Sequence, residues 1–422
     1  MSLKLRLPRR DFSLGVEPEH RINFIWLWIA LFMVFVAQGL TLPLFPVRIV
    51  EKGISLQQYG VLKSVASLAV ILTQIWLGRF SGRPRDRKFI IIASLLIMAP
   101  AVIIFPRAET MVLFGVLLVF HGAAFNVLRT LTTTWVSLWA QEGEMGRMHG
   151  IFRISGSLGW VFVTVFLGFL LDRYAYGTTY WLAAAVLVGT AVFIALGLKG
   201  FDDYTRQDTY TATDDIDQAQ QAVIEPFVWP LEIKLLLLAS MIFTLGQTMG
   251  LNLDVIFFVQ ELGVTNQQFG WLASLQAWFE MPLMLAMGIV SDRFDVVKML
   301  TLGVFVAGFR WLLLSITTKA VWAYGVQLIH AVGVTVAEVL MVTFIARIVP
   351  GQYLAQVLGW RVATGNMAVF MAPALAGVIG DYLGLRAVFR GSALLVFLSA
   401  CIIYGLSRRT KEVHPSVEDL CS

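Results

Sequence analysis

The stretch EKGISLQQYGVL, from Glu51 to Leu62, recurs as ELGVTNQQFGWL, from Glu261 to Leu272. Each copy is a polar segment between long apolar runs, and the two copies begin 210 positions apart. The match continues along the chain at nearly the same offset. The further matched pairs are Gly78 and Gly288, Arg83 and Arg293, Lys88 and Lys298, His121 and His330, Arg153 and Arg361, and Asp172 and Asp381. So persistent a repeat predicts that the chain consists of two copies of one unit.

The composition indicates a membrane protein. Of the 422 residues, 58% are hydrophobic and 14% are charged, whereas a soluble domain carries about 25% charged residues. Because a hydrocarbon core about 30 Å thick needs roughly 20 apolar residues per spanning helix, the long uncharged runs predict several crossings. The two cysteines indicate neither a disulfide framework nor a metal site, and we expect no cofactor.

Hydropathy divides the chain into about twelve apolar spans. They cover residues 22–46, 57–78, 89–106, 110–137, 148–171, 178–198, 231–258, 267–290, 299–317, 320–348, 354–380 and 385–407. With six spans in each copy, the two copies share one topology and are related by an axis along the membrane normal. We therefore expect an all-α membrane protein with twelve transmembrane helices, arranged as two pseudo-symmetric six-helix bundles.

A polar segment rich in Asp, Thr and Gln separates the two copies, as a flexible linker would. The predicted organisation is a cytoplasmic tail at 1–21, an N-terminal bundle at 22–198, a cytoplasmic linker at 199–230, a C-terminal bundle at 231–407 and a cytoplasmic tail at 408–422.

Basic residues set the expected orientation. They concentrate in the loop after the second span and in the C-terminal tail, whereas the opposite loops carry fewer. Because cytoplasmic loops are enriched in Lys and Arg, both termini are expected in the cytoplasm, in a multi-pass protein of the cell (inner) membrane. Lys63, near the outer end of its span, is expected to extend to the outer interface.

Two six-span halves with a polar linker resemble the major facilitator superfamily. In that superfamily the loop after the second span runs Gly-x-x-x-Asp-Arg, which the second copy keeps as Gly288, Asp292 and Arg293. The first copy departs, because Gly82 stands at the aspartate position; with one extra residue, its loop resembles that of the sugar-efflux branch. The resemblance implies a cytoplasmic gate formed by Asp292, Arg293, Arg83, Asp86 and Arg87. The alternative is that these charged residues only fix the orientation of the chain in the membrane and form no gate.

The stretch GIFRISGSLGW, from Gly150 to Trp160, is similar to the fifth span of the galactoside/oligosaccharide proton symporters. In that family the Arg of this motif binds sugar hydroxyls and the Trp stacks on the sugar ring, which implies these roles for Arg153 and Trp160. Arg310 and His330 also reproduce a spacing that the family ties to substrate binding or proton coupling. The family's acid in span four would fall near Trp135, so this sequence lacks it.

Arg153 and Trp160 lie seven residues apart and so share one helix face. A guanidinium suits hydroxyl pairs or a carboxylate, and Trp offers a flat apolar surface. Gln38 and Gln276 are further candidates for substrate binding. The alternative for Arg153 and Trp160 is a helix-packing face with an Arg that extends toward the interface; for the glutamines it is interhelical hydrogen bonding.

Ionisable residues at membrane depth are candidates for proton coupling. An apolar pocket favours the neutral form of a carboxyl group, whereas a nearby Arg favours the charged form. Glu280 with Arg310, and Glu338 with His330, are the expected coupled pairs. Fixed helix-to-helix ion pairs are the alternative.

These residues favour a secondary active transporter that moves a sugar-like solute or an organic acid by alternating access, coupled to protons. The alternative is an exporter of sugars or amphipathic drugs by proton antiport. An intramembrane enzyme is disfavoured, because neither HExxH nor GxSxG occurs. The expected partners are the solute, protons and the lipid bilayer. No nucleic-acid partner is expected, and the chain is expected to be a monomer.

Overall fold

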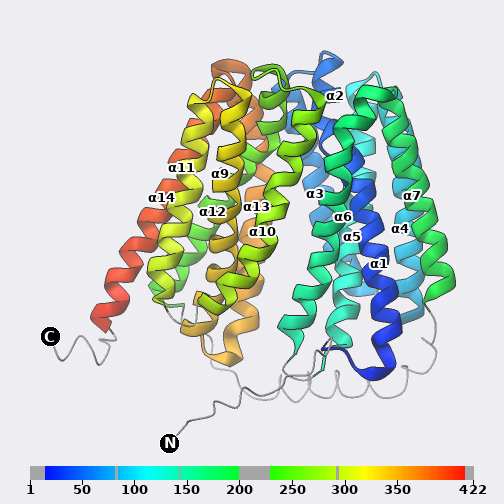
Figure 1. Cartoon of the computed structure of the whole chain (residues 1–422). Coiled ribbons are helices and arrows are strands. Elements are labelled where there is room, and N and C mark those ends of the chain that lie inside the picture. The colour runs from blue at the N-terminus through cyan, green and yellow to red at the C-terminus, as the bar shows by residue number, and fades with distance from the viewer. Residues whose placement is uncertain (1–14, 81–83, 142–143, 199–228, 291–293, 414–422) are drawn as a thin grey trace, which may run out of the picture.

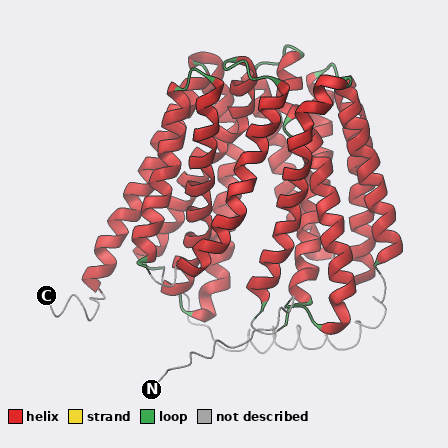
Figure 2. Cartoon of the chain, viewed as in Figure 1, coloured by secondary structure: helices red, strands yellow, loops and turns green. Residues whose placement is uncertain are grey.

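The computed structural model describes residues 15–80, 84–141, 144–198, 229–290 and 294–413. These residues are almost entirely helical (Figure 2). The helices are α1 (Arg21–Thr41), α2 (Leu44–Glu51), α3 (Leu56–Phe80), α4 (Pro84–Ile104), α5 (Met111–Leu138), α6 (Met145–Arg173), α7 (Tyr176–Gly197), α9 (Leu231–Gln260), α10 (Asn266–Val290), α11 (Val296–Ile316), α12 (Ala320–Ile348), α13 (Gly351–Leu383) and α14 (Leu385–Val413).

Each predicted span coincides with one of these helices, and α1 and α2 together form the first span. Within the described residues, 11 segments are long and apolar enough to cross a membrane. α10 is not among these segments, and several side chains at its end lie outside the described residues. The all-α membrane fold is therefore confirmed.

The described helices form two groups that lie side by side (Figure 1), and each group provides six spans when α1 and α2 are taken as one. The first comprises α1 to α7, where α1 packs on α6 and α7, and α4 packs on α5 and α7. The second comprises α9 to α14, where α9 packs on α13 and α14, and α11 packs on α12 and α14. The expected linker, residues 199–230, falls almost wholly outside the described residues.

The start of α1 and the end of α14 lie on one side of the molecule, called here the terminal side, and the opposite side is the far side (Figure 1). The two bundles converge toward the far side and diverge toward the terminal side (Figure 1). Between bundles, the strongest packing is that of α3 on α13 and of α6 on α10. These two contacts are related by the repeat, since α3 corresponds to α10 and α6 to α13.

The repeated dozen residues build the far-side start of α3 and of α10. Gly53 and Gly263 adopt positive φ angles of 81° and 59° and turn the chain, which glycine does without steric cost. Ser55 and Gln58 then form a capping box, in which Ser55 N donates to Gln58 Oε1 (3.0 Å) and Gln58 N donates to Ser55 Oγ (3.2 Å). Thr265 and Gln268 repeat both bonds at the same distances.

The last glycine of each repeated stretch allows the bundles to touch. A Cβ on Gly60 of α3 would collide with the carbonyl of Pro373 in α13. A Cβ on Gly270 of α10 would lie 2.6 Å from the carbonyl oxygen of Thr164 in α6. The repeated sequence is therefore a turn, a helix cap and an interbundle contact, made twice.

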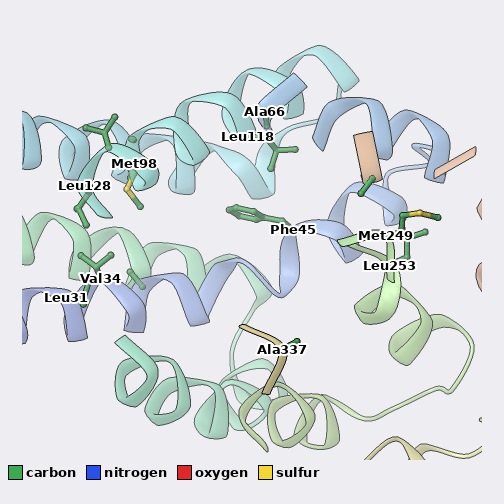
Figure 3. Packing of buried hydrophobic residues seen from close by; sticks show 14 of the residues in the cluster. Leu31, Val34, Phe45, Ala66, Met98, Leu118, Leu128, Met249, Leu253 and Ala337 are labelled. Carbon is green, nitrogen blue, oxygen red and sulfur yellow. The ribbon is translucent and has the colours of Figure 1, made fainter. Parts of the chain in front are cut away.

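The interior of each bundle is apolar and aromatic (Figure 3). In the N-terminal bundle, Phe45 stacks on Phe105 with ring centroids 4.1 Å apart, and Phe105 stacks on Tyr180 at 6.0 Å. Large apolar side chains such as Leu72 and Trp322 are exposed. Outward apolar side chains on helices of spanning length form a surface suited to lipid.

Residues 15–20, which the sequence assigned to the N-terminal tail, contact the terminal-side end of α5. Val16 forms an isolated bridge with Ala140, and the His20 ring stacks on Trp139 at 5.4 Å. These contacts fix the start of α1 against the α5–α6 connection.

Candidate transport cavity

A cavity of about 1040 Å³ lies between the two bundles. The N-terminal bundle contributes side chains from α1, α2, α3, α5 and α6, and the C-terminal bundle contributes side chains from α9, α10 and α12. Its charged residues are Lys63, Arg129 and Arg153 from the first bundle and Asp254 and Glu280 from the second. An ionisable group at this depth is stable when it faces water or a partner, and this cavity brings five such groups together in an otherwise apolar protein.

The charged residues occupy two levels. Lys63 and Asp254 lie about 10 Å along their helices from the far-side ends, at 1.5 Å per residue. Arg129, Arg153 and Glu280 lie about 12 to 15 Å from the terminal-side ends of their helices. The two levels bracket the middle of the membrane, where transporter sites usually lie.

The structure brings four of the sequence-predicted residues to the cavity: Arg153, Trp160, Gln276 and Glu280. The Trp160 indole Nε1–H donates to the carbonyl oxygen of Ala273 in α10 at 3.0 Å, so Trp160 also links the bundles. Gln38 does not line the cavity; its side chain is 1% exposed within the N-terminal bundle.

Arg310 pairs with Asp254 instead of the expected Glu280. Arg310 Nη2 donates to Asp254 Oδ2 and to Gln327 Oε1, both at 3.1 Å. The Arg310 guanidinium also stacks 3.6 Å from the Trp311 ring centroid, a cation–π contact. Arg310 itself is 0% exposed, whereas Asp254 and Gln327 line the cavity. The ion pair thus joins the cavity wall to the bundle interior.

Glu338 likewise has a partner other than the expected His330. Its Oε2 accepts a hydrogen bond from Arg361 Nη2 at 2.9 Å. His330 is 1% exposed, with its ring 6.4 Å from that of Trp311. Neither Glu338 nor His330 lines the cavity. An acid from α12 and an arginine from α13 therefore form a partly exposed ion pair between two helices of the C-terminal bundle.

Two aspartates close the far side by crossing between bundles. The Asp381 carboxylate, from the end of α13, accepts hydrogen bonds from the backbone N–H groups of Leu56 (2.9 Å) and Gln57 (2.8 Å) at the start of α3. Asp172, from the end of α6, accepts a hydrogen bond from Asn266 Nδ2 at the start of α10 (2.9 Å). Carboxylates are stabilising at helix N-termini, where unpaired N–H groups and the helix dipole meet.

Residues 24–390 match the family model described as the MFS_1 like family. The chain belongs to that family. The expected membership of the major facilitator superfamily is thereby confirmed.

Two relatives share sequence similarity with this MFS_1-like chain over most of its length. Maltose permease of Geobacillus stearothermophilus is 24% identical over 382 residues, which cover 89% of this chain and 91% of the permease. Sugar efflux transporter A of Escherichia coli is 23% identical over 367 residues, covering 85% and 89% of the two chains. Both relatives are named as transporters of sugars.

A solved structure of the nucleoside transporter NupG shares the fold, with a TM-score of 0.73. It is 12% identical in sequence, and the superposition covers 91% of this chain and 98% of that one. This likeness concerns the fold alone.

Most of the expected gate of this MFS_1-like chain falls outside the described residues, namely Arg83, Asp292 and Arg293. Asp86 is exposed in the first turn of α4, and Arg87 is half-buried. Lys88 Nζ donates to the carbonyl oxygens of Ala195 (2.9 Å) and Leu198 (2.6 Å) at the end of α7. A cation there satisfies terminal carbonyls and complements the helix dipole.

Sequence reasoning missed two cations of the site. Lys63 was expected at the outer interface, but it is half-buried and lines the cavity. Arg129 was not among the predicted site residues, although it lies inside a predicted span, where an ionisable residue is itself a signal. The repeat offset of 209, which matches His121 to His330, would also have matched Arg129 to Glu338.

Proposed function

We propose that the protein is a secondary active transporter that moves a small organic solute, sugar-like or an organic acid, by alternating access and with proton coupling. The observation that carries this proposal is the charged cavity between two repeat-related bundles. Its far side is closed by helix contacts that occur once in each half of the repeat. Two related bundles around a central site can rock against each other to expose that site to either side.

The concentration of basic residues supports a cytoplasmic terminal side. The described conformation, with helices joined at the far side, is then an inward-facing state. For the outward-facing state we assign closure of the terminal side to Asp292, Arg293, Arg83, Asp86 and Arg87, as the superfamily resemblance implies.

We assign proton coupling to the two carboxylates that line the cavity, Glu280 and Asp254. Glu280 interacts electrostatically with Arg153 on the facing bundle and with Glu338 in its own bundle. Movement of the bundles would change the distance from Glu280 to Arg153, and with it the proton affinity of the carboxyl group. Asp254 is held by Arg310, so its proton affinity depends on whether that ion pair is intact.

A second candidate function is export by proton antiport. The similarity to sugar efflux transporter A favours it. Both functions use the same cavity, and they differ in whether the proton and the solute move in the same direction.

The test is transport into proteoliposomes under an imposed pH gradient, with a panel of sugars and organic acids. Symport predicts that solute accumulates on the side toward which protons flow, and antiport predicts accumulation on the opposite side. Solute movement that ignores the gradient for every compound tested contradicts proton coupling.

A further inference from the structure

The terminal-side level of the cavity contains two arginines beside each other. Arg129 of α5 and Arg153 of α6 both line the cavity and are exposed to it. Arg129 and Arg153 lie at the same depth, about 12 to 14 Å from the terminal-side ends of α5 and α6, and these two helices contact each other. Within the described residues, neither guanidinium group makes a hydrogen bond or an ion pair. Two like charges held together at membrane depth are unfavourable unless an anion joins them.

The repeat-related positions of the C-terminal bundle carry an acid and an arginine instead of two arginines. Arg129 corresponds to Glu338 at an offset of 209, and Arg153 corresponds to Arg361 at an offset of 208. In the C-terminal bundle these positions form the 2.9 Å ion pair between Glu338 and Arg361. The same fold can therefore accommodate an acid and an arginine here. In the N-terminal bundle an arginine stands in place of the acid, and the position of the missing carboxylate opens into the cavity.

The remaining charges do not neutralise the pair. Lys63 adds a third cation to the same bundle's wall. On the facing wall, Asp254 is already neutralised by Arg310. Glu280 is the other carboxylate of the described lining, and it faces three cations. The cavity therefore has an excess of positive charge.

We propose that the transported solute is an organic anion whose carboxylate binds between Arg129 and Arg153. Two guanidinium forks can each donate paired hydrogen bonds to carboxylate oxygens. Trp160, two turns from Arg153 on the same face of α6, offers the solute's carbon skeleton an apolar surface. This inference rests on the proposed transport function and names its substrate class.

The test measures thermal stabilisation of the purified full-length chain in detergent, so it requires neither transport nor a pH gradient. Acids are compared with neutral partners of the same skeleton: glucuronate with glucose, lactate with propane-1,2-diol, and benzoate with benzyl alcohol. At least one acid is expected to raise the Tm more than its neutral partner. Arg129→Gln and Arg153→Gln should each weaken the apparent affinity for that acid at least tenfold.

The variant Arg129→Glu recreates the acid–arginine pair of the other bundle, so it should fold and lose the preference for the acid. Arg390→Gln is the matched control; Arg390 is exposed on α14 and does not line the cavity. It should bind the acid as the wild type does.

The proposal is overturned if no acid stabilises the chain more than its neutral partner. It is also overturned if inorganic phosphate or sulfate alone stabilises it, or if Arg129→Glu and Arg153→Gln keep the preference for the acid. Failure of the transport proposal has a different signature, in which the acid binds through these arginines but proteoliposomes move no solute.

Discussion

Arg310 is fully buried, and a single carboxylate, that of Asp254, compensates its charge. Its guanidinium is held by Asp254, Gln327 and the Trp311 ring. Removal of one partner from a buried ion pair leaves the other charge uncompensated, which typically costs about 3–5 kcal/mol. Loss of both partners leaves no such charge.

We therefore expect Asp254→Ala to lower the Tm of the purified chain strongly, because it leaves the buried Arg310 charge without its carboxylate partner. The double variant Asp254→Ala/Arg310→Ala should recover much of that loss, as a double-mutant cycle on thermal unfolding can measure. The ion-pair account fails if the two single substitutions have additive effects.

Glu280 is the second residue for which the account makes a test, because proton coupling is assigned to its carboxyl group. A glutamine at position 280 keeps the size and hydrogen bonding of the side chain but cannot exchange a proton. We expect Glu280→Gln to abolish solute accumulation driven by a pH gradient, while solute exchange at equal pH continues. Both are measured in the same proteoliposomes. Gradient-driven accumulation at wild-type level in this variant would remove Glu280 from the mechanism.

At the scale of elements, the far-side closure depends on two aspartates that bond to helix starts of the opposite bundle. Asp381 caps α3, and Asp172 accepts a hydrogen bond from the Asn266 side chain at the start of α10. A lost cap costs about 1 kcal/mol, and a lost side-chain hydrogen bond costs about as much. If both bonds break when the far side opens, Asp172→Ala/Asp381→Ala should favour the open state by roughly 2 kcal/mol, or about thirtyfold in population.

The measurement is the labelling rate of a cysteine at Asn252, a cavity residue. A membrane-impermeant thiol reagent is applied from the far side, in a background with Cys401 and Cys421 replaced by serine. The double aspartate variant should react faster than its parent. Asp295→Ala is the matched control, since Asp295 caps α11 within its own bundle, with 3.0 Å and 3.2 Å bonds to Val297 N and Lys298 N. Equal rates for the two variants would contradict closure by Asp172 and Asp381.

The number of helices and their approximate bounds could be predicted from the sequence, because hydrocarbon thickness and helix rise fix both. The repeated stretch predicted two related halves, and the structure places its capping boxes and glycines at the contact between them.

The partners of buried charges were predicted less well. The depth of a residue in the membrane follows from its position along the helix. The neighbouring helix that its side chain faces depends on how the helices pack. Glu280 was the acid expected for Arg310, and the pairing of Arg310 with Asp254 required the structure.

For the whole molecule, the central claim is that the bundles open one side of the cavity as they close the other. Repeat-related positions provide natural reporters. Leu138 and Arg347 lie in the last turns of α5 and α12 on the terminal side, and Tyr174 and Tyr382 lie on the far side at the ends of α6 and α13. All four side chains are exposed, so labels at these positions should leave the core intact.

The most direct test is double electron–electron resonance between spin labels at Leu138→Cys and Arg347→Cys, and separately at Tyr174→Cys and Tyr382→Cys, in the background that has serine at Cys401 and Cys421. With the transported solute present, we expect the terminal-side distance to shorten and the far-side distance to lengthen in the same fraction of molecules. Distances that stay fixed, or that change together in the same direction, would contradict alternating access.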